Sequence, residues 1–352
     1  MYRAEQLPIF QNRTFGSAKE ANDCLKGDVL IAQDSATGLI SNQAFRPELL
    51  QYGADYHNEQ GLSAVFQAHL LDVTRIIVRH FQGASLIEVG CGKGHFLESL
   101  QALGFGIVGV DPAYEGSNPA ITKQYFSSQA GLSGDGIILR HVLEHIQDPI
   151  AFLSKIRDAN GGRGKVYIEV PCFDWICEHR VWFDIFYEHV NYFRLRDFYR
   201  MFGTVYDAGH IFNGQYLYAV ADLASLRTPA TADADLFDFP GDFLESVNRY
   251  ASRLNKSKSA CRAIWGAASK GVIFALFMER AGARIDMAVD INPAKQGRFL
   301  AVTGLQVHAP DAAMEIFPQE TEVFVMNGNY LEEIKALTKG RFDYIAVDNE
   351  RI

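Results

Sequence analysis

The sequence predicts an α/β protein with two parallel-sheet units. Apolar strands alternate with helical stretches over residues 63–223, and a second, shorter alternation covers residues 241–352. Continuous apolar strands separated by helices indicate parallel sheets that are covered on both faces. In each alternation a glycine-rich turn stands between a strand and a helix. With 352 residues, of which 48% are hydrophobic, the chain is long enough to build more than one core.

Four segments follow one another along the chain. Residues 1–62 show no clear period, which predicts an irregular N-terminal segment or a small cap. The first α/β unit, residues 63–223, opens with an amphipathic helix over 63–81, where apolar residues recur at three and four positions. Residues 224–240 lose the apolar period and carry proline and small polar residues, as a linker does. The smaller second unit occupies residues 241–352.

Two β-like runs, GTVYDAGHIF and QYLYAVADL, end the first unit and are joined by Asn213 and Gly214. An Asn-Gly pair between two such runs is a strong hairpin signal, because a two-residue turn needs positive φ angles. We therefore expect an antiparallel hairpin that closes the first sheet.

The composition excludes several classes of partner. A formal net charge of -9 argues against a nucleic-acid surface, which needs a clustered positive field. The five cysteines form no CxxC pair, so neither a disulfide framework nor a structural zinc site is indicated. The sequence shows no signal-peptide pattern and no apolar run near the roughly 20 residues that cross a bilayer. We expect a cytoplasmic protein with a small-molecule partner, and the sequence predicts no particular oligomeric state.

The first glycine-rich turn has the features of a nucleoside site. The stretch EVGCGKGHF lies between a predicted strand and a helix, and Asp111 ends the next strand. Glycines at Gly90, Gly92 and Gly94 let the backbone approach a ligand without Cβ clashes, and a carboxylate after the second strand can accept ribose hydroxyl groups. A dinucleotide oxidoreductase and a turn that serves only helix packing are the alternatives.

The GxGxG spacing, opened by an acidic residue, resembles motif I of class I S-adenosylmethionine-dependent methyltransferases. The stretch HVLEHIQDP follows the fourth strand, where this family carries a similar sequence. The resemblance implies a Rossmann-like domain with S-adenosylmethionine as cofactor, in which Glu88 braces the turn near the methionine amino group and Asp111 holds the ribose. The other cofactor contacts that it implies are Gly90, Cys91, Gly92, Gly94, Pro112 and His141. A capped structural histidine is an equal interpretation of His141.

The second glycine-rich turn, WGAASKG, is a weak signal alone, because it is not a P-loop. Its helix N-terminus and Lys270 nevertheless suit an anionic group. GAASKGVIF, VDINPAKQGRFL and VMNGNYLEEI resemble the C-terminal Rossmann-like domain of the sugar C-methyltransferase family, whose members act on nucleotide-linked keto-deoxysugars. The resemblance implies a nucleotide-linked or phosphorylated sugar-like substrate, with contacts at Tyr56, Asn191, Lys270 and Asn329.

The N-terminal segment departs from this family. Its members usually carry four zinc-binding cysteines there, whereas the segment before Tyr52 contains only Cys24. One thiolate cannot build a tetrahedral structural site. We therefore predict no bound metal.

The stretch FYEHVNYF, Phe186–Phe193, corresponds to a YHEHxxYF segment of that family, which provides a catalytic histidine. Methylation at carbon requires a base and a stabilised enolate oxyanion, methylation at oxygen requires a base, and an amine needs only to lose a proton. The resemblance makes His189 the general base, with Glu188 beside it. Phe186 stands where the family has a tyrosine, and Tyr187 is the neighbouring hydroxyl. A second acid-imidazole pair, Glu178 and His179, is expected in a solvated loop.

The expected function is methyl transfer from S-adenosylmethionine to carbon next to a keto group of a sugar-like substrate. One alternative is an O- or N-methyltransferase that acts on a small molecule or a polysaccharide precursor. Another is a non-catalytic scaffold that keeps the fold.

Overall fold

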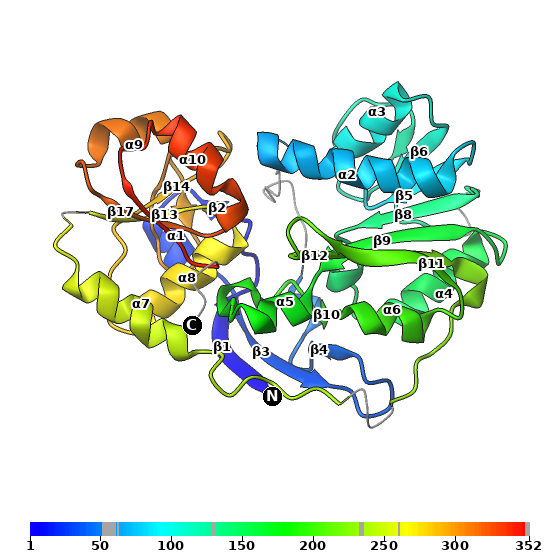
Figure 1. Cartoon of the computed structure of the whole chain (residues 1–352), viewed down its shortest axis with the longest axis horizontal. Helices are drawn as coiled ribbons and strands as arrows, with labels where there is room; N and C mark the ends of the chain where they lie inside the picture. The colour runs from blue at the N-terminus through cyan, green and yellow to red at the C-terminus, as the bar shows by residue number, and fades with distance from the viewer. Residues whose placement is uncertain (51–60, 62, 128–130, 232–235, 260, 349–352) are drawn as a thin grey trace.

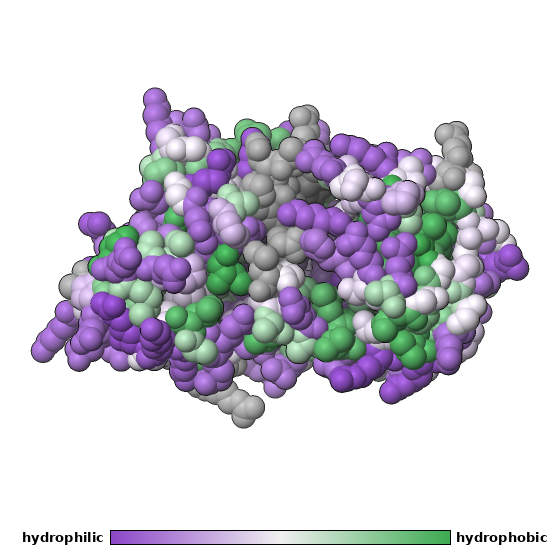
Figure 2. Space-filling view, turned by 90° about the horizontal axis from the view of Figure 1, so that it is seen from above, coloured by the Kyte–Doolittle hydropathy of each residue, from purple (hydrophilic) through white to green (hydrophobic). Residues whose placement is uncertain are grey.

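The computed structural model describes residues 1–50, 61, 63–127, 131–231, 236–259 and 261–348. It contains two α/β units side by side, with a small N-terminal sheet below them (Figure 1). This arrangement confirms the predicted fold class. No helix among the described residues is long and apolar enough to cross a membrane. Seen from above, hydrophilic side chains cover most of the surface and hydrophobic ones gather at separate places (Figure 2).

The N-terminal segment forms strands rather than irregular chain. An antiparallel sheet runs in the order β1-β3-β4-β10. Its strands are β1 (Tyr2–Pro8), β3 (Lys26–Gln33), β4 (Ile40–Asn42) and β10 (Asn191–Tyr192). Alternate residues of β3, including Val29 and Ile31, are buried, so the strand has a period of two that glycine and polar neighbours obscure. Because β10 belongs to the first unit, the cap is built into that unit.

The first unit contains a seven-stranded sheet in the order β11-β12-β9-β8-β5-β6-β7. Its strands are β5 (Leu86–Val89), β6 (Ile107–Val110), β7 (Ile121–Thr122), β8 (Gly136–Arg140), β9 (Lys165–Pro171), β11 (Val205–Ile211) and β12 (Tyr216–Asp222). Strands β5 to β9 are parallel, and β12 pairs with β9 in the antiparallel sense. The predicted closing hairpin is therefore confirmed.

Helices cover both faces of this sheet (Figure 1). They are α2 (Ala64–Phe81), α3 (His95–Ala102), α4 (Pro149–Ala159), α5 (Phe173–Glu178) and α6 (Leu195–Met201), with short 3-10 turns η3 (Leu143–His145), η4 (Trp182–Asp184) and η5 (Leu223–Ser225). The N-terminus of α2 is capped by Ser63, whose hydroxyl accepts from Phe66 N, and Val73 and Ile77 on its inner face are fully buried. Capping and the apolar stripe thus fix the helix that the sequence predicted.

The strand order places a topological switch at β5. From β5 the chain moves outward to β6 and β7, and then returns to β8 on the other side. Loops that leave the carboxyl ends of β5 and β8 therefore diverge and leave a crevice, which is where open α/β sheets bind ligands.

The second unit is a five-stranded parallel sheet in the order β16-β14-β13-β17-β18. Its elements are α7 (Glu245–Lys256), β13 (Arg262–Trp265), α8 (Ser269–Arg280), β14 (Met287–Val289), β16 (Val307–His308), α9 (Pro310–Ile316), β17 (Glu322–Val325), η7 (Gly328–Tyr330), α10 (Leu331–Leu337) and β18 (Asp343–Ala346). The N-terminal segment also reaches this unit, because β2 (Thr14–Phe15), which precedes α1 (Ala18–Asn22), pairs with β15 (Phe299–Leu300).

Buried aromatic packing joins the two units. Trp182 of η4 stacks on Phe274 of α8 with ring centroids 5.6 Å apart, and its indole N–H donates to Ser246 Oγ at 2.8 Å. Both rings are fully buried. Gln215, in the β11-β12 turn, donates to Oδ1 of Asn327 at 2.9 Å, and Asn327 follows the end of β17. The carboxyl end of the second sheet therefore faces the first unit.

Gly27 in β3 should be essential for seating the cap on the first unit. A Cβ atom there would overlap the ring of Tyr187 and lie 2.8 Å from Ile9 Cδ1. We expect Gly27→Ala to lower the free energy of unfolding by roughly 1–3 kcal/mol, the usual cost of overpacking. Gly106→Ala is the matched control, since a Cβ there meets nothing within 4 Å. Urea denaturation of both variants tests this, and equal stabilities would contradict the packing argument.

Candidate active site

The glycine-rich turn after β5 is shaped for a close ligand. Gly90 and Gly94 have φ angles of 75° and 85°, which favour glycine. A Cβ atom on Gly90 would overlap Val142, and one on Gly94 would overlap Ile121. Gly92 also has a positive φ, but it faces open space, since a Cβ atom there would meet nothing within 4 Å. The turn therefore packs tightly against Val142 and Ile121 at Gly90 and Gly94, whereas it has free space beside it at Gly92.

The carboxylate of Asp111 lies at this turn. Its Oδ2 accepts from Gly92 N at 2.9 Å, and its Oδ1 accepts from Ala113 N at 2.7 Å. Pro112 beside it is exposed and Cys91 is half-buried. The structure thus brings together the residues predicted to hold a ribose and to line the cofactor.

Glu88 is buried near the end of β5, with 3% of its surface exposed. Burial raises the pKa of its carboxyl group to about 7, against the lowering effect of Arg140. Its Oε2 has no hydrogen-bond partner within the described residues. A cationic ligand group at this atom would satisfy the carboxylate and favour its ionised form.

Glu169, in the middle of β9, organises the neighbouring charges. Its Oε1 accepts from His69 Nε2 at 2.6 Å, and its Oε2 accepts from Arg140 Nε at 2.8 Å. His141 Nε2 lies 3.3 Å from Oε1. Although burial opposes ionisation, Arg140 and the two imidazoles hold the pKa of Glu169 well below its usual range. Glu169 was not predicted from the sequence, although an acidic residue inside the apolar run KVYIEV was a signal for it.

His141 belongs to this network of charges and also contacts Glu144, which adjoins the loop of His189. Its Nδ1 lies 3.2 Å from Glu144 Oε1. Burial alone would lower the pKa of His141, but its close contacts with the carboxylates of Glu144 and Glu169 raise it to about 9. Its imidazole is therefore an ionised member of the network, and its predicted contact with the cofactor stays a prediction.

His189 lies next to His145, a residue that was not predicted from the sequence. Their rings are T-shaped, with centroids 4.9 Å apart, and the ring of Phe186 lies 4.0 Å from His189. Burial, followed by the charges of His145, His141 and Lys270, holds the pKa of His189 well below its usual range, and burial lowers that of His145. Both imidazoles are therefore neutral, the form that accepts a proton or binds a ligand.

The two residues before His189 face the N-terminal cap. Glu188 Oε2 accepts from Gln11 N at 2.9 Å, and the hydroxyl of Tyr187 accepts from Arg46 N at 2.9 Å. The segment is a loop between η4 and β10, as an orienting role for Glu188 requires. The catalytic roles of Glu188 and Tyr187 remain predictions.

Asn191 connects the two histidine loops. Its Nδ2 donates to the carbonyl groups of Leu143 and Ile146, which flank His145. Val190 N donates to Glu144 O at 2.7 Å. The amide of Asn191 therefore positions the turn η3 against the loop of His189, and its predicted substrate contact remains a prediction.

The predicted substrate residues of the second unit lie along its border with the first. Lys270 Nζ lies 3.1 Å from Asp184 Oδ2 and 5.3 Å from the centroid of the Trp175 ring. Asn329 Oδ1 accepts from Asn213 Nδ2 at 2.7 Å. Tyr56 lies outside the described residues. Lys270 thus approaches the histidine loop, whereas Asn329 contacts the β11-β12 turn.

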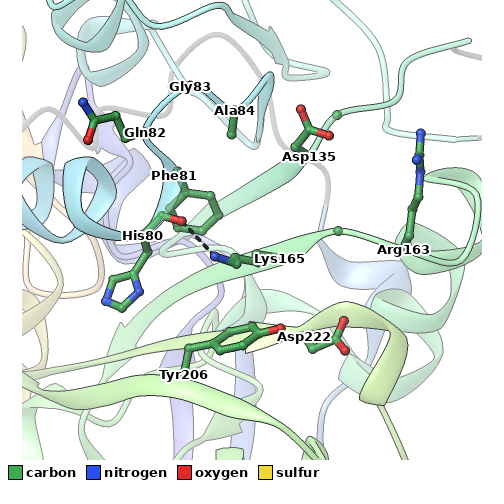
Figure 3. A pocket seen from close by; sticks show the side chains of 12 residues that line it. His80, Phe81, Gln82, Gly83, Ala84, Asp135, Arg163, Lys165, Tyr206 and Asp222 are labelled. Atoms are coloured by element: carbon green, nitrogen blue, oxygen red, sulfur yellow. Dashed lines mark hydrogen bonds between the residues drawn. The ribbon is translucent and has the colours of Figure 1, made fainter.

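A separate polar pocket lies at the opposite end of the strands of the first sheet (Figure 3). Lys165, which begins β9, donates from Nζ to His80 O at 3.1 Å. Tyr206 and Asp222 of the hairpin form another wall. The pocket lies at the amino end of β9, whereas Asp111 and His141 follow carboxyl ends of strands, so it is distinct from the candidate active site.

Comparison with known proteins identifies both units. Residues 63–205 match a family described as a methyltransferase domain, and residues 237–342 match a C-methyltransferase C-terminal domain. The chain belongs to the S-adenosylmethionine-dependent methyltransferases. S-adenosylmethionine is accordingly its cofactor. Binding of its nucleoside and amino-acid parts by the turn of Gly90–Gly94 and by Asp111 stays a prediction, which the contact of Asp111 with Gly92 N favours.

Individual relatives resemble only part of this methyltransferase. A ubiquinone biosynthesis O-methyltransferase of Dinoroseobacter shibae is 30% identical over 93 residues, which are 22% of this chain and 37% of the relative. One from Cereibacter sphaeroides is 30% identical over 92 residues, with the same coverage. The alignments thus span little more than a third of these relatives.

Solved structures of similar proteins also cover less than half of the chain. A SAM dependent methyltransferase from Archaeoglobus fulgidus is 17% identical, with 46% of this chain and 95% of that chain covered and a TM-score of 0.34. An S-adenosylmethionine dependent methyltransferase from Mesorhizobium loti is 13% identical, with 45% and 100% covered and a TM-score of 0.35. The family assignment rests on the two domain matches.

Cofactor affinity should depend on the ionisation of Glu88. Its carboxyl group has a raised pKa of about 7, so below that pH it is neutral and does not attract the ligand ammonium group. We expect binding of S-adenosylhomocysteine to strengthen by up to about tenfold between about pH 6 and about pH 8, following the ionised fraction of Glu88. Calorimetric titration measures this. Glu88→Gln should remove that dependence, and an unchanged pH profile in the variant would exclude Glu88 as its source.

Proposed function

We propose that this methyltransferase methylates a carbon next to a keto group of a nucleotide-linked or phosphorylated sugar-like substrate. The observation that carries the proposal is the largely buried imidazole of His189, which packs against the rings of His145 and Phe186. Burial lowers its pKa, so the ring is in the form that accepts a proton. The C-methyltransferase C-terminal domain supports the choice of carbon as acceptor.

His189 performs the proton transfer in this proposal. S-adenosylmethionine supplies the methyl group as an electrophile. His189 takes the proton from the carbon beside the keto group, and the electrons of that C–H bond form the enolate. The enolate carbon then forms a bond to the methyl group while the methyl–sulfur bond breaks, and the proton leaves His189 to solvent. A positioned base of this kind contributes roughly 10²–10⁴-fold to the rate.

The enolate oxygen needs a positive or hydrogen-bonding partner. Phe186 cannot supply the hydroxyl of the tyrosine that it replaces, and the hydroxyl of Tyr187 is bonded to the backbone of Arg46. Lys270 of the second unit carries a positive charge that lowers the pKa of His189. We assign the oxyanion to Lys270, whose ion pair with Asp184 holds its ammonium group in place.

O-methylation is the second candidate. The similar segments of the ubiquinone biosynthesis O-methyltransferases favour it, although they match only about a fifth of this chain. An O-methyltransferase requires a base but forms no enolate, so isotope exchange at carbon separates the two reactions.

His189 should be essential for removing the proton from carbon and dispensable for binding of the cofactor. In D2O with S-adenosylhomocysteine bound, we expect the enzyme to exchange the proton beside the keto group of nucleotide-linked keto sugars, as followed by NMR. His189→Ala should lower exchange and methyl transfer by roughly 10²-fold or more, with an unchanged affinity for S-adenosylhomocysteine.

The matched control is His179→Ala, because His179 stacks on Trp175 at the end of α5 and belongs to no predicted site. Labelled S-adenosylmethionine and the same panel of sugars then locate the new methyl group. A methyl group found on oxygen without isotope exchange would replace C-methylation by O-methylation, and full turnover in His189→Ala would eliminate the base.

A further inference from the structure

Three donor atoms converge at the proposed base, which supplies one of them. Glu144, His145 and His189 each offer one ligand atom, and these atoms all lie within 4.8 Å of one another. Glu144 and His145 lie on η3, and His189 lies on the loop that Asn191 ties to that turn. Ligand atoms at about 2.0–2.2 Å from one zinc ion lie somewhat closer together than this limit, so a small inward movement of the side chains lets the three share a cation.

His145 is oriented as a metal-binding histidine usually is. Its Nδ1 lies 2.9 Å from the carbonyl oxygen of Glu188, an acceptor, so Nδ1 carries the proton and Nε2 keeps its lone pair. Metal-ligating histidines commonly donate their second ring nitrogen to a carbonyl or carboxylate in this way, which fixes the tautomer and the ring direction. The carbonyl group of Glu188 therefore already holds His145 in the orientation that a metal ligand needs.

Glu144 and His189 provide further donor atoms. Glu144 is 1% exposed, and while its Oε1 pairs with His141, its Oε2 is buried without a hydrogen-bond partner within the described residues. Leaving a buried carboxylate oxygen without a partner costs free energy. The contacts of the His189 ring are with the rings of His145 and Phe186. A cation between these side chains would satisfy the buried oxygen.

We propose that Glu144, His145 and His189 bind one divalent cation of the zinc class. Two imidazoles and one carboxylate suit borderline metals such as Zn²⁺ or Co²⁺, whereas Mg²⁺ and Ca²⁺ prefer oxygen ligands. Three protein ligands leave a fourth position open, as in many zinc sites. This group differs from the cysteine site of the related family, because it contains no thiolate and lies in the methyltransferase domain. The proposal therefore departs from the sequence-based prediction of no bound metal, which considered only cysteines.

Binding of the cation and proton abstraction exclude each other at His189. The lone pair that would take a substrate proton is the one that would bind the metal, so the cation should inhibit turnover. This consequence rests on the proposed function, whereas binding itself does not. Lys270 and the ionised His141 oppose a cation nearby, but Lys270 is paired with Asp184 and His141 with Glu169. Glu144 contributes negative charge to the group.

The test uses the full chain, stripped of metal with a chelator and measured without cofactor or substrate. Calorimetric titration with Zn²⁺ should give one site per chain, and Co²⁺ should give an absorption spectrum without thiolate bands. Glu144→Gln and His189→Ala should each weaken binding at least about tenfold. Cys24→Ser and Cys261→Ser, which remove a thiol of the cap and a thiol of the second unit, should leave it unchanged.

Each outcome decides the proposal. Absence of binding at micromolar Zn²⁺, binding that His189→Ala leaves unchanged, or binding lost in the cysteine variants would overturn it. His189 is more exposed than Glu144, so His189→Ala serves where Glu144→Gln fails to fold, as circular dichroism reveals. In a separate measurement, Zn²⁺ should suppress isotope exchange and the chelator should restore it. Loss of exchange in every condition would contradict the proposed function without affecting the binding result.

Discussion

The charge of Glu169 is the constraint on which the site depends. A carboxylate that is fully buried in a central strand is costly unless it is paired and hydrogen-bonded. Arg140, His69 and His141 supply that pairing from β8, from α2 and from the loop beyond β8. The three elements must therefore meet at one point of the sheet. Removal of one partner would leave a buried charge rather than an inert gap.

Glu169 is connected to the loop of His189 through His141 and Glu144. His141 contacts Glu169 on one side and Glu144 on the other. The backbone carbonyl of Glu144 accepts from Val190, next to His189. The carboxyl ends of β5, β6 and β8 hold the glycine turn, Asp111 and His141 within the same crevice. The loop of the proposed base is thus connected to the buried charge of Glu169.

Local signals in the sequence were sufficient for the strands, the glycine turns, the two units and the closing hairpin. Each depends on residues that are close in sequence, such as Asn213 and Gly214. The N-terminal sheet was missed because glycine and polar neighbours obscure the period of two in its strands, and because its last strand, β10, comes about 150 residues further on. Glu169 and His145 were missed because their partners come from different elements. The direction of Tyr187, toward Arg46, is likewise a tertiary property.

The loop of His189 is held from three sides, and this explains how a cap that lacks the family's cysteines can serve the site. The backbone of Gln11 binds Glu188, β4 pairs with β10, and Trp182 just before the loop stacks against α8 of the second unit. None of these contacts requires a metal in the cap. A shared sheet and a buried backbone hydrogen bond fix the position of the loop as directly as a zinc cluster would, provided that all three parts of the chain are assembled.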